Sequence, residues 1–224
     1  MERHFDEELN DLKKNLLNLG SLAEKAIFNS VDALKELSVE KANAVIKNDS
    51  IIDECELKID EQCIDLLALH QPMAVDLRFI TMVMKISTDL ERIADLAVDI
   101  AQRALELSGK PLLKPLVDIP KLTVLAQEMT KKAIDAFVNS DTELAKEIIL
   151  KDKEADDIRN MVQTELINDY IAKDKSTISR AIPLLLVARH LERICDHTTN
   201  IAEDVIYMVE AKVVKHHTQN LFQK

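Results

Sequence analysis

Paired acidic residues four positions apart occur in two similar sets in this sequence. The pairs are Asp49 and Asp53, Glu91 and Asp95, Asp152 and Asp156, and Glu192 and Asp196. Residues four apart lie on one face of an α-helix, so each pair would present two carboxylates side by side. Carboxylate oxygens are the ligands that hard divalent and trivalent cations prefer. The spacing therefore predicts a cation site wherever two such pairs face one another.

The two acidic sets belong to an internal duplication. Residues 90–95 read L-E-R-I-A-D, and residues 191–196, which lie 101 positions later, read L-E-R-I-C-D. The acidic pairs upstream of these motifs repeat at an offset of 103. Two nearly equal offsets indicate that about half of the chain has been duplicated, with a small length change in one loop.

The acidic pairs also match in height. In an antiparallel hairpin of helices, residues equally distant from the turn lie at the same level. With the first turn at residues 71–72, Asp53 lies within one residue of the level of Glu91, and Asp49 within one residue of the level of Asp95. The second half gives the same match. Four carboxylates at one level raise some of their pKa values by mutual repulsion unless a cation neutralises them.

One other interpretation of the acidic pairs, a solvated or ion-paired surface, stays open, and a stricter motif for metal binding is missing. Helical Asp and Glu are commonly solvated or paired with Lys and Arg, and this chain has a formal net charge of -11. Di-iron carboxylate bundles use E-x-x-H motifs, which the acidic stripes lack. His190 and His197 flank the second set, but the equivalent first-half positions hold no histidine. Agreement in type, spacing, height and repetition favours metal binding.

The composition indicates an all-α protein. Only 2 of the 224 residues are Gly and 5 are Pro, whereas 47% are hydrophobic and 31% are charged. Sheets with many turns need Gly, Asn and Pro at their turns, and this chain holds too few of them. The net charge of -11 disfavours nucleic acid and an acidic membrane surface as direct partners.

No apolar run approaches the 18 residues or so that a membrane-spanning helix needs. The first residues are charged and do not resemble a secretory signal, so we expect a cytoplasmic protein. Association with a membrane would then depend on a partner.

Apolar periodicity and helix-breaking residues predict six long helices. Their expected ranges are 6–37, 38–70, 73–107, 121–139, 142–173 and 177–214. Residues 108–120 carry Gly109 and three of the five prolines, and we interpret them as a linker. We therefore expect two tandem-duplicated antiparallel three-helix bundles, at residues 1–110 and 111–224, placed end to end or side by side. Pro183 predicts a kink or a late start in the sixth helix.

The repeated L-E-R-I-x-D motif, with D-L-R-F-I at 76–80 before it and D-I-A at 99–101 after it, resembles the PhoU family of phosphate-transport accessory proteins. The resemblance covers nearly the whole chain. It implies a cytoplasmic regulator that works with a phosphate ABC transporter and a sensor histidine kinase. In that role it would repress the phosphate-starvation response when phosphate is ample.

The same resemblance implies metal clusters, multinuclear and containing iron or zinc. Magnesium and manganese stay open as alternatives for a site of oxygen ligands. The implied ligands are Asp49, Asp53, Glu91, Asp95 and Asp99 in the first half, and Asp152, Asp156, Glu192, Asp196 and Asn200 in the second. Asn200 stands where the first half has Asp99. An amide is a neutral donor, so we expect the second cluster to hold fewer or less highly charged ions.

The sequence favours a non-enzymatic adaptor. It contains no G-x-x-x-x-G-K-[ST], G-x-G-x-x-G or G-x-S-x-G motif. The alternatives are a metal-dependent enzyme of the carboxylate-bundle kind and a metal-storage helical protein. We also expect a homodimer.

Overall fold

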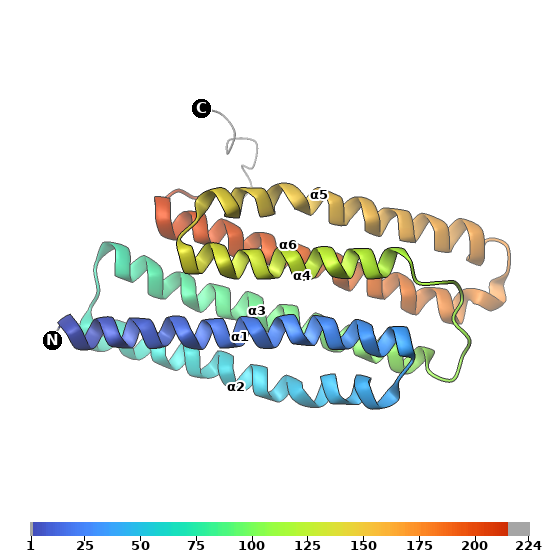
Figure 1. The fold of residues 1–224 in the computed structure, drawn as a ribbon, viewed down its shortest axis with the longest axis horizontal. Helices are drawn as coiled ribbons and strands as arrows, with labels where there is room; N and C mark the ends of the chain where they lie inside the picture. Colours follow the sequence, from blue (N-terminus) through green and yellow to red (C-terminus); the bar gives the residue numbers. More distant parts are fainter. Residues whose placement is uncertain (1, 215–224) are drawn as a thin grey trace.

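The computed structural model describes residues 2–214, and this part of the chain consists of helices and their connections, without a strand. The α-helices are α1 (Glu2–Glu36), α2 (Val39–His70), α3 (Ala74–Leu107), α4 (Asp118–Asn139), α5 (Thr142–Glu165) and α6 (Ile178–Glu210). The all-α prediction with six long helices is confirmed (Figure 1).

Local sequence signals explain most helix ends. The Ser38 side chain caps α2 by accepting a hydrogen bond from the backbone N–H of Lys41, and Asp141 caps α5 in the same way through Leu144. Gly109 follows α3 with a φ of 75°, in the left-handed region that glycine adopts without strain. The linker therefore begins where the sequence predicts it.

The differences from the expected helices are confined to helix ends. The α4 helix begins at Asp118, three residues before the expected start, so the linker is shorter than predicted. The expected fifth helix to residue 173 is α-helical only to Glu165 and continues as a π-helical segment, η1 (Leu166–Ile171). A 3₁₀ turn, η2 (Lys175–Thr177), leads into α6, and α6 ends at Glu210 rather than at residue 214.

Pro183 lies in the second turn of α6, and the helix starts before it. Of the two expected effects of Pro183, the late start is therefore wrong, and the kink stays a prediction. A proline so close to the N-terminus removes a single intrahelical hydrogen bond, which the remaining length of the helix tolerates.

Each half forms a three-helix bundle, and the two bundles pack side by side through α3 against α6 and α1 against α4 (Figure 1). Their buried side chains form one continuous hydrophobic core. Gly20 of α1 permits the close approach of α4, because a Cβ atom there would lie 2.4 Å from Cδ1 of Ile134. The domain boundary near residue 110 stays a prediction, and residues 215–224 of the second domain lie outside the described residues.

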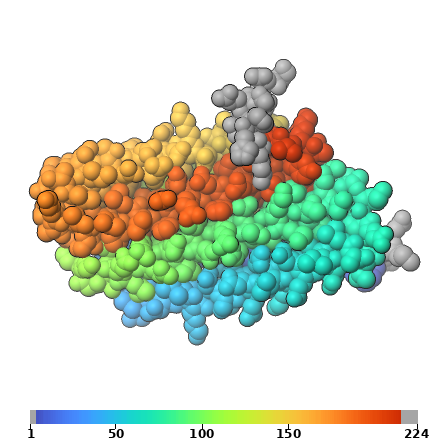
Figure 2. Space-filling model, turned by 180° about the vertical axis from the view of Figure 1, so that it is seen from behind, coloured from blue at the N-terminus to red at the C-terminus, as the bar shows by residue number. Residues whose placement is uncertain are grey.

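The helices that carry the acidic pairs lie next to one another. Figure 2 shows them on one face of the molecule as adjacent bands, with α5 in yellow to orange, α6 in orange to red, α3 in green and α2 in blue. Both acidic sets therefore belong to hairpins that contribute to this face.

Candidate metal centre

In the first half, α2 supplies Asp49 and Asp53, and α3 supplies Glu91 and Asp95. Burial raises the pKa of the Asp49 carboxyl, and the charges of Asp53 and Asp95 raise it further. Burial also raises the pKa of Glu91, and Asp53 adds to that rise from across the hairpin. The α2–α3 hairpin thus brings the two pairs within electrostatic reach of one another, as the height argument predicts.

Two further acids extend the stripe on α2. Glu56 accepts a hydrogen bond of 3.4 Å from the hydroxyl of Thr88, and its pKa is raised by burial and by the neighbouring charge of Asp60. The Oδ1 atom of Asp60 is buried without a hydrogen-bond partner, and burial raises the pKa of this carboxyl too. The first-half site therefore holds an excess of negative charge that a cation would neutralise.

The principal counter-charge in the first half is Arg92. Its Nη1 lies 2.8 Å from Oδ2 of Asp95, and its Nε lies 3.5 Å from Oε2 of Glu91. The side chain is 56% exposed, so this is a solvent-accessible contact that is worth little free energy. A bound cation could replace it at small cost.

In the second half, α5 supplies Asp152 and Asp156, and α6 supplies Glu192 and Asp196. The pKa of Asp196 is raised to about 6, chiefly by burial and then by the charges of Glu192, Asp152 and Asp156. The pKa of Asp152 is raised by burial, Asp156 and Glu192, against the opposing effect of a hydrogen bond with Thr199. These four carboxylates also interact across a helix hairpin.

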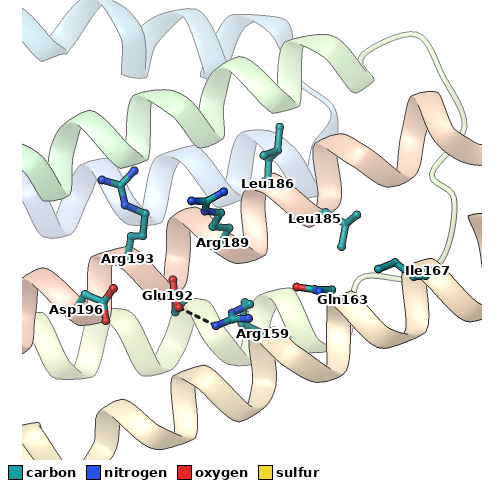
Figure 3. Close-up of a pocket in the computed structure, with 9 residues that line it drawn as sticks. All are labelled: Arg159, Gln163, Ile167, Leu185, Leu186, Arg189, Glu192, Arg193 and Asp196. Atoms are coloured by element: carbon teal, nitrogen blue, oxygen red, sulfur yellow. Dashed lines mark hydrogen bonds and ion pairs between the residues drawn. The ribbon is translucent and has the colours of Figure 1, made fainter.

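The second set differs from the first because its arginine, Arg159, is less exposed than Arg92 and bridges carboxylates on two helices. Nη2 of Arg159 is 3.1 Å from Oε1 of Glu192 (Figure 3). The same atom is 3.3 Å from Oδ1 of Asp156. Arg159 is not among the predicted site residues, although the offset of 103 places it opposite Glu56 of the first half. An internal cation thus already neutralises two of the second-half candidates.

The remaining candidates, Asp99 and Asn200, make their polar contacts between the bundles. Oδ2 of Asp99 is 3.7 Å from Nδ1 of His190 on α6. Nδ2 of Asn200 is 3.5 Å from Oδ1 of Asp89 on α3, and the same oxygen is 2.8 Å from Nδ1 of His197. Asp99 lies eight residues after Glu91, and Asn200 lies eight residues after Glu192. At 3.6 residues per turn, eight residues rotate a side chain about the helix axis by about 80°, which turns Asp99 and Asn200 towards the other bundle.

The acidic side chains are not assembled as a finished coordination sphere. Within residues 2–214, no three His, Cys, Asp or Glu side chains converge as ligands of one metal ion. The candidate ligands are oxygen atoms with an excess of negative charge, and such atoms are suitable ligands for a hard cation. Binding would nevertheless require the acidic side chains to rotate towards one another. No helix in this part of the chain is both long and apolar enough to cross a bilayer.

Comparisons with known proteins relate both halves to one family. The sequence profile of the PhoU domain matches residues 16–104 and 119–205. A protein from Aquifex aeolicus named "Phosphate-specific transport system accessory protein PhoU homolog" is 41% identical over 209 residues, which cover 93% of this chain and 94% of the relative. A Thermotoga maritima protein, "Phosphate-specific transport system accessory protein PhoU homolog 2", is 34% identical over all of this chain and 96% of its own length.

Two solved structures share the fold. The crystal structure of PhoU from Pseudomonas aeruginosa superposes with a TM-score of 0.89 at 37% identity, covering 93% of this chain and all of that one. The phosphate transport system regulatory protein PhoU from Streptococcus pneumoniae gives a TM-score of 0.88 at 30% identity, covering 94% of this chain and 99% of that one. The two-bundle arrangement is therefore shared with these proteins.

Proposed function

The chain belongs to the PhoU domain family, and from this membership we propose that it is an accessory and regulatory protein of phosphate uptake. The observation that carries the proposal is the match of both halves to the PhoU domain, together with relatives named as phosphate transport accessory proteins over nearly the full length. In this role the chain acts in the cytoplasm and binds the cytoplasmic parts of a phosphate ABC transporter. It also contacts a sensor histidine kinase and represses the phosphate-starvation response.

An adaptor suits the surface of this molecule better than an enzyme does. The groove beside the second acidic set is open and is crossed by an ion pair between Arg159 and Glu192. Long helices with exposed polar faces offer area for protein partners instead. We infer that the chain acts through binding, and that it does so as a homodimer, which sedimentation of the metal-loaded protein would test.

Deletion of the gene in its bacterial host tests the regulatory role. We expect phosphate-scavenging genes to be expressed in phosphate-rich medium, because the repressing contact would be lost while the transporter and kinase remain. Measurement of their transcripts in the deletion strain and in a strain that carries the gene on a plasmid checks this. Equal levels of these transcripts in the deletion strain and in the strain with the plasmid-borne gene would contradict the proposal.

We further propose that a cation binds the first acidic set, held by Asp49, Asp53, Glu91 and Asp95. Burial, and then mutual repulsion, raises the pKa values of Asp49 and Glu91, which supports a site that a positive ion would stabilise. When bound, the ion would neutralise the carboxylates and fix the α2–α3 hairpin. Iron or zinc is the proposed metal, with magnesium and manganese as alternatives.

The second set, Asp152, Asp156, Glu192 and Asp196, is proposed as a weaker site. Arg159 already pairs with two of its members, whereas the first half has Glu56 at that position. Arg159 already neutralises part of the negative charge of the second set. It is therefore a stronger reason than the neutral amide of Asn200 to expect fewer or less highly charged ions at this set.

A double substitution in each half tests the metal proposal. Asp53→Asn with Glu91→Gln should remove most of the metal bound by the parent, because it deletes two of the four charged donors. Asp156→Asn with Glu192→Gln is the matched control and should remove less. Metal content after dialysis, and the change in melting temperature on metal addition, measure the effect. A parent that binds no iron, zinc, manganese or magnesium would rule out the site.

A further inference from the structure

A groove of about 680 Å³ runs between α5 and α6 beside the second acidic set (Figure 3). Its lining residues are Arg159, Gln163, Ile167, Leu185, Leu186, Arg189, Glu192, Arg193 and Asp196. Three guanidinium groups therefore gather in one groove of a chain whose formal net charge is -11. A local concentration of positive charge on such an acidic protein calls for a physical reason.

Two of these arginines have no polar partner among residues 2–214. Arg189 and Arg193 are exposed, lie four residues apart on α6 and extend to the same side of that helix (Figure 3). Arg159 forms ion pairs with Glu192 and Asp156, but Arg189 and Arg193 form no hydrogen bond or ion pair in the described part of the chain. Their guanidinium groups are therefore available to carboxylates from another molecule.

The duplicated half shows that the fold itself does not require this basic character. By the repeat offsets, Arg159 corresponds to Glu56, Gln163 to Asp60 and Arg189 to Thr88, so two of the three arginines have no basic counterpart. The third, Arg193, corresponds to Arg92. The corresponding first-half groove, of about 520 Å³, is lined by Asp60, Thr88, Asp89, Lys85 and Met84 of that half, with Asn200 and Asp204 from α6. The groove between α5 and α6, the basic groove, thus has three arginines against two acids, whereas the first-half groove, the acidic groove, has one lysine against three acids.

The basic groove also offers apolar surface next to its arginines. The side chain of Ile167 is 41% exposed, and those of Leu185 and Leu186 are half-buried. Arginine beside apolar side chains is the composition found at the centre of protein interfaces. An occupant that matches both features carries carboxylates next to an apolar side chain.

We propose that the groove between α5 and α6 docks an acidic amphipathic segment of a protein partner. The segment places an apolar side chain against Leu185 and Leu186, and its carboxylates pair with Arg189 and Arg193. The identification of the partner as the cytoplasmic part of a phosphate transporter rests on the proposed function. The acidic first-half groove repels the same segment, so the docking is confined to one half.

Charge reversal in the groove tests the docking. Binding of the full chain to the purified transporter in nanodiscs is measured for the parent and for Arg189→Glu with Arg193→Glu. Because both residues are exposed, the folding of the variant should be unaffected, and thermal melts check this. We expect at least a tenfold loss of affinity, as for charge pairs at an interface. Lys85→Glu with Thr88→Glu, at exposed positions of the first-half groove, is the matched control and should change affinity less than threefold.

A second measurement does not depend on the transporter. A peptide that alternates leucine and glutamate is titrated into the full chain, and the arginine side-chain NMR signals are followed. Shifts of the Arg189 and Arg193 signals in the parent, together with loss of the peptide's effect on the Arg159 signal in the charge-reversed variant, support the groove. They do so even if the transporter does not bind, which would count against the proposed function alone. Equal transporter binding by parent and variant would overturn the inference. So would a response to inorganic phosphate without a response to the peptide, or no response to either.

Discussion

Replacing Asp196 by asparagine should stabilise the metal-free protein at neutral pH. The pKa of the Asp196 carboxyl is raised from 3.8 to about 6, because burial and the charges of Glu192, Asp152 and Asp156 disfavour its ionised form. The native state therefore holds this proton more tightly than the unfolded chain does. The resulting cost to stability is absent below about pH 3.8 and complete above about pH 6, where the carboxylate is ionised in both states.

The size of the effect follows from the same shift. For a fully buried carboxyl, a pKa raised by about two would correspond to about 3 kcal/mol of lost folding stability at neutral pH. Asp196 is more than a third exposed, however, so solvent screening reduces the expected gain to roughly 1 kcal/mol. For a chain of this length, such a gain raises the melting temperature by about 2–4 °C at pH 7.5. The gain should shrink towards zero near pH 4.

Thermal melts of the metal-free parent and the Asp196→Asn variant, from pH 4 to pH 7.5, check this prediction. Asp157→Asn changes the net charge equally at an exposed position of α5, and its melting temperature should follow that of the parent. An increment for Asp196→Asn that is the same at pH 4 and pH 7.5, or is absent at both, would show that carboxylate burial and repulsion are not the cause. With saturating metal the order should reverse, because the variant lacks a proposed ligand.

Three further substitutions test the packing and the helix ends through thermal or denaturant unfolding. Gly20→Val should cost about 1–3 kcal/mol by overpacking against Ile134, and a variant as stable as the parent would contradict the close approach of α1 and α4. Asp141→Ala should cost about 1 kcal/mol through loss of the α5 cap, whereas Asp141→Asn should retain most of it. Glu165→Gln should cost roughly 2 kcal/mol, because Lys114 is buried and pairs with Glu165, and Glu165→Asp should cost less.

The sequence predicts the helices and the hairpin register well because their signals are local. Ser38 and Gly109 mark helix ends through their own hydrogen bonds and backbone conformations. Equal distances from a tight turn then bring Asp53 near Glu91, without any knowledge of the rest of the molecule. The role of Arg159 was also within reach, since the repeat offset aligns it with Glu56.

The remaining features depend on contacts between distant segments. The choice between end-to-end and side-by-side bundles depends on buried apolar faces of α3 and α6, whose sequence pattern does not identify their partner. The contacts of Asp99 and Asn200 follow from that choice, so they could not be assigned from acidic spacing alone. The π-helical segment Leu166–Ile171 carries no Gly or Pro and has no local signal either.

The polar contacts between α3 and α6 favour association of the two different halves over association of either half with a second copy of itself. Under the offset of 101, Asp89 corresponds to His190 and Asp99 to Asn200, so the Asp89–Asn200 and His190–Asp99 contacts are two versions of one ancestral pair. A first half that associated with its own copy would place Asp89 against Asp99, and these like charges repel. A second half that did so would place His190 against Asn200 and form no ion pair. Only the mixed association pairs a histidine with a carboxylate, so half-chains produced separately should prefer each other to themselves.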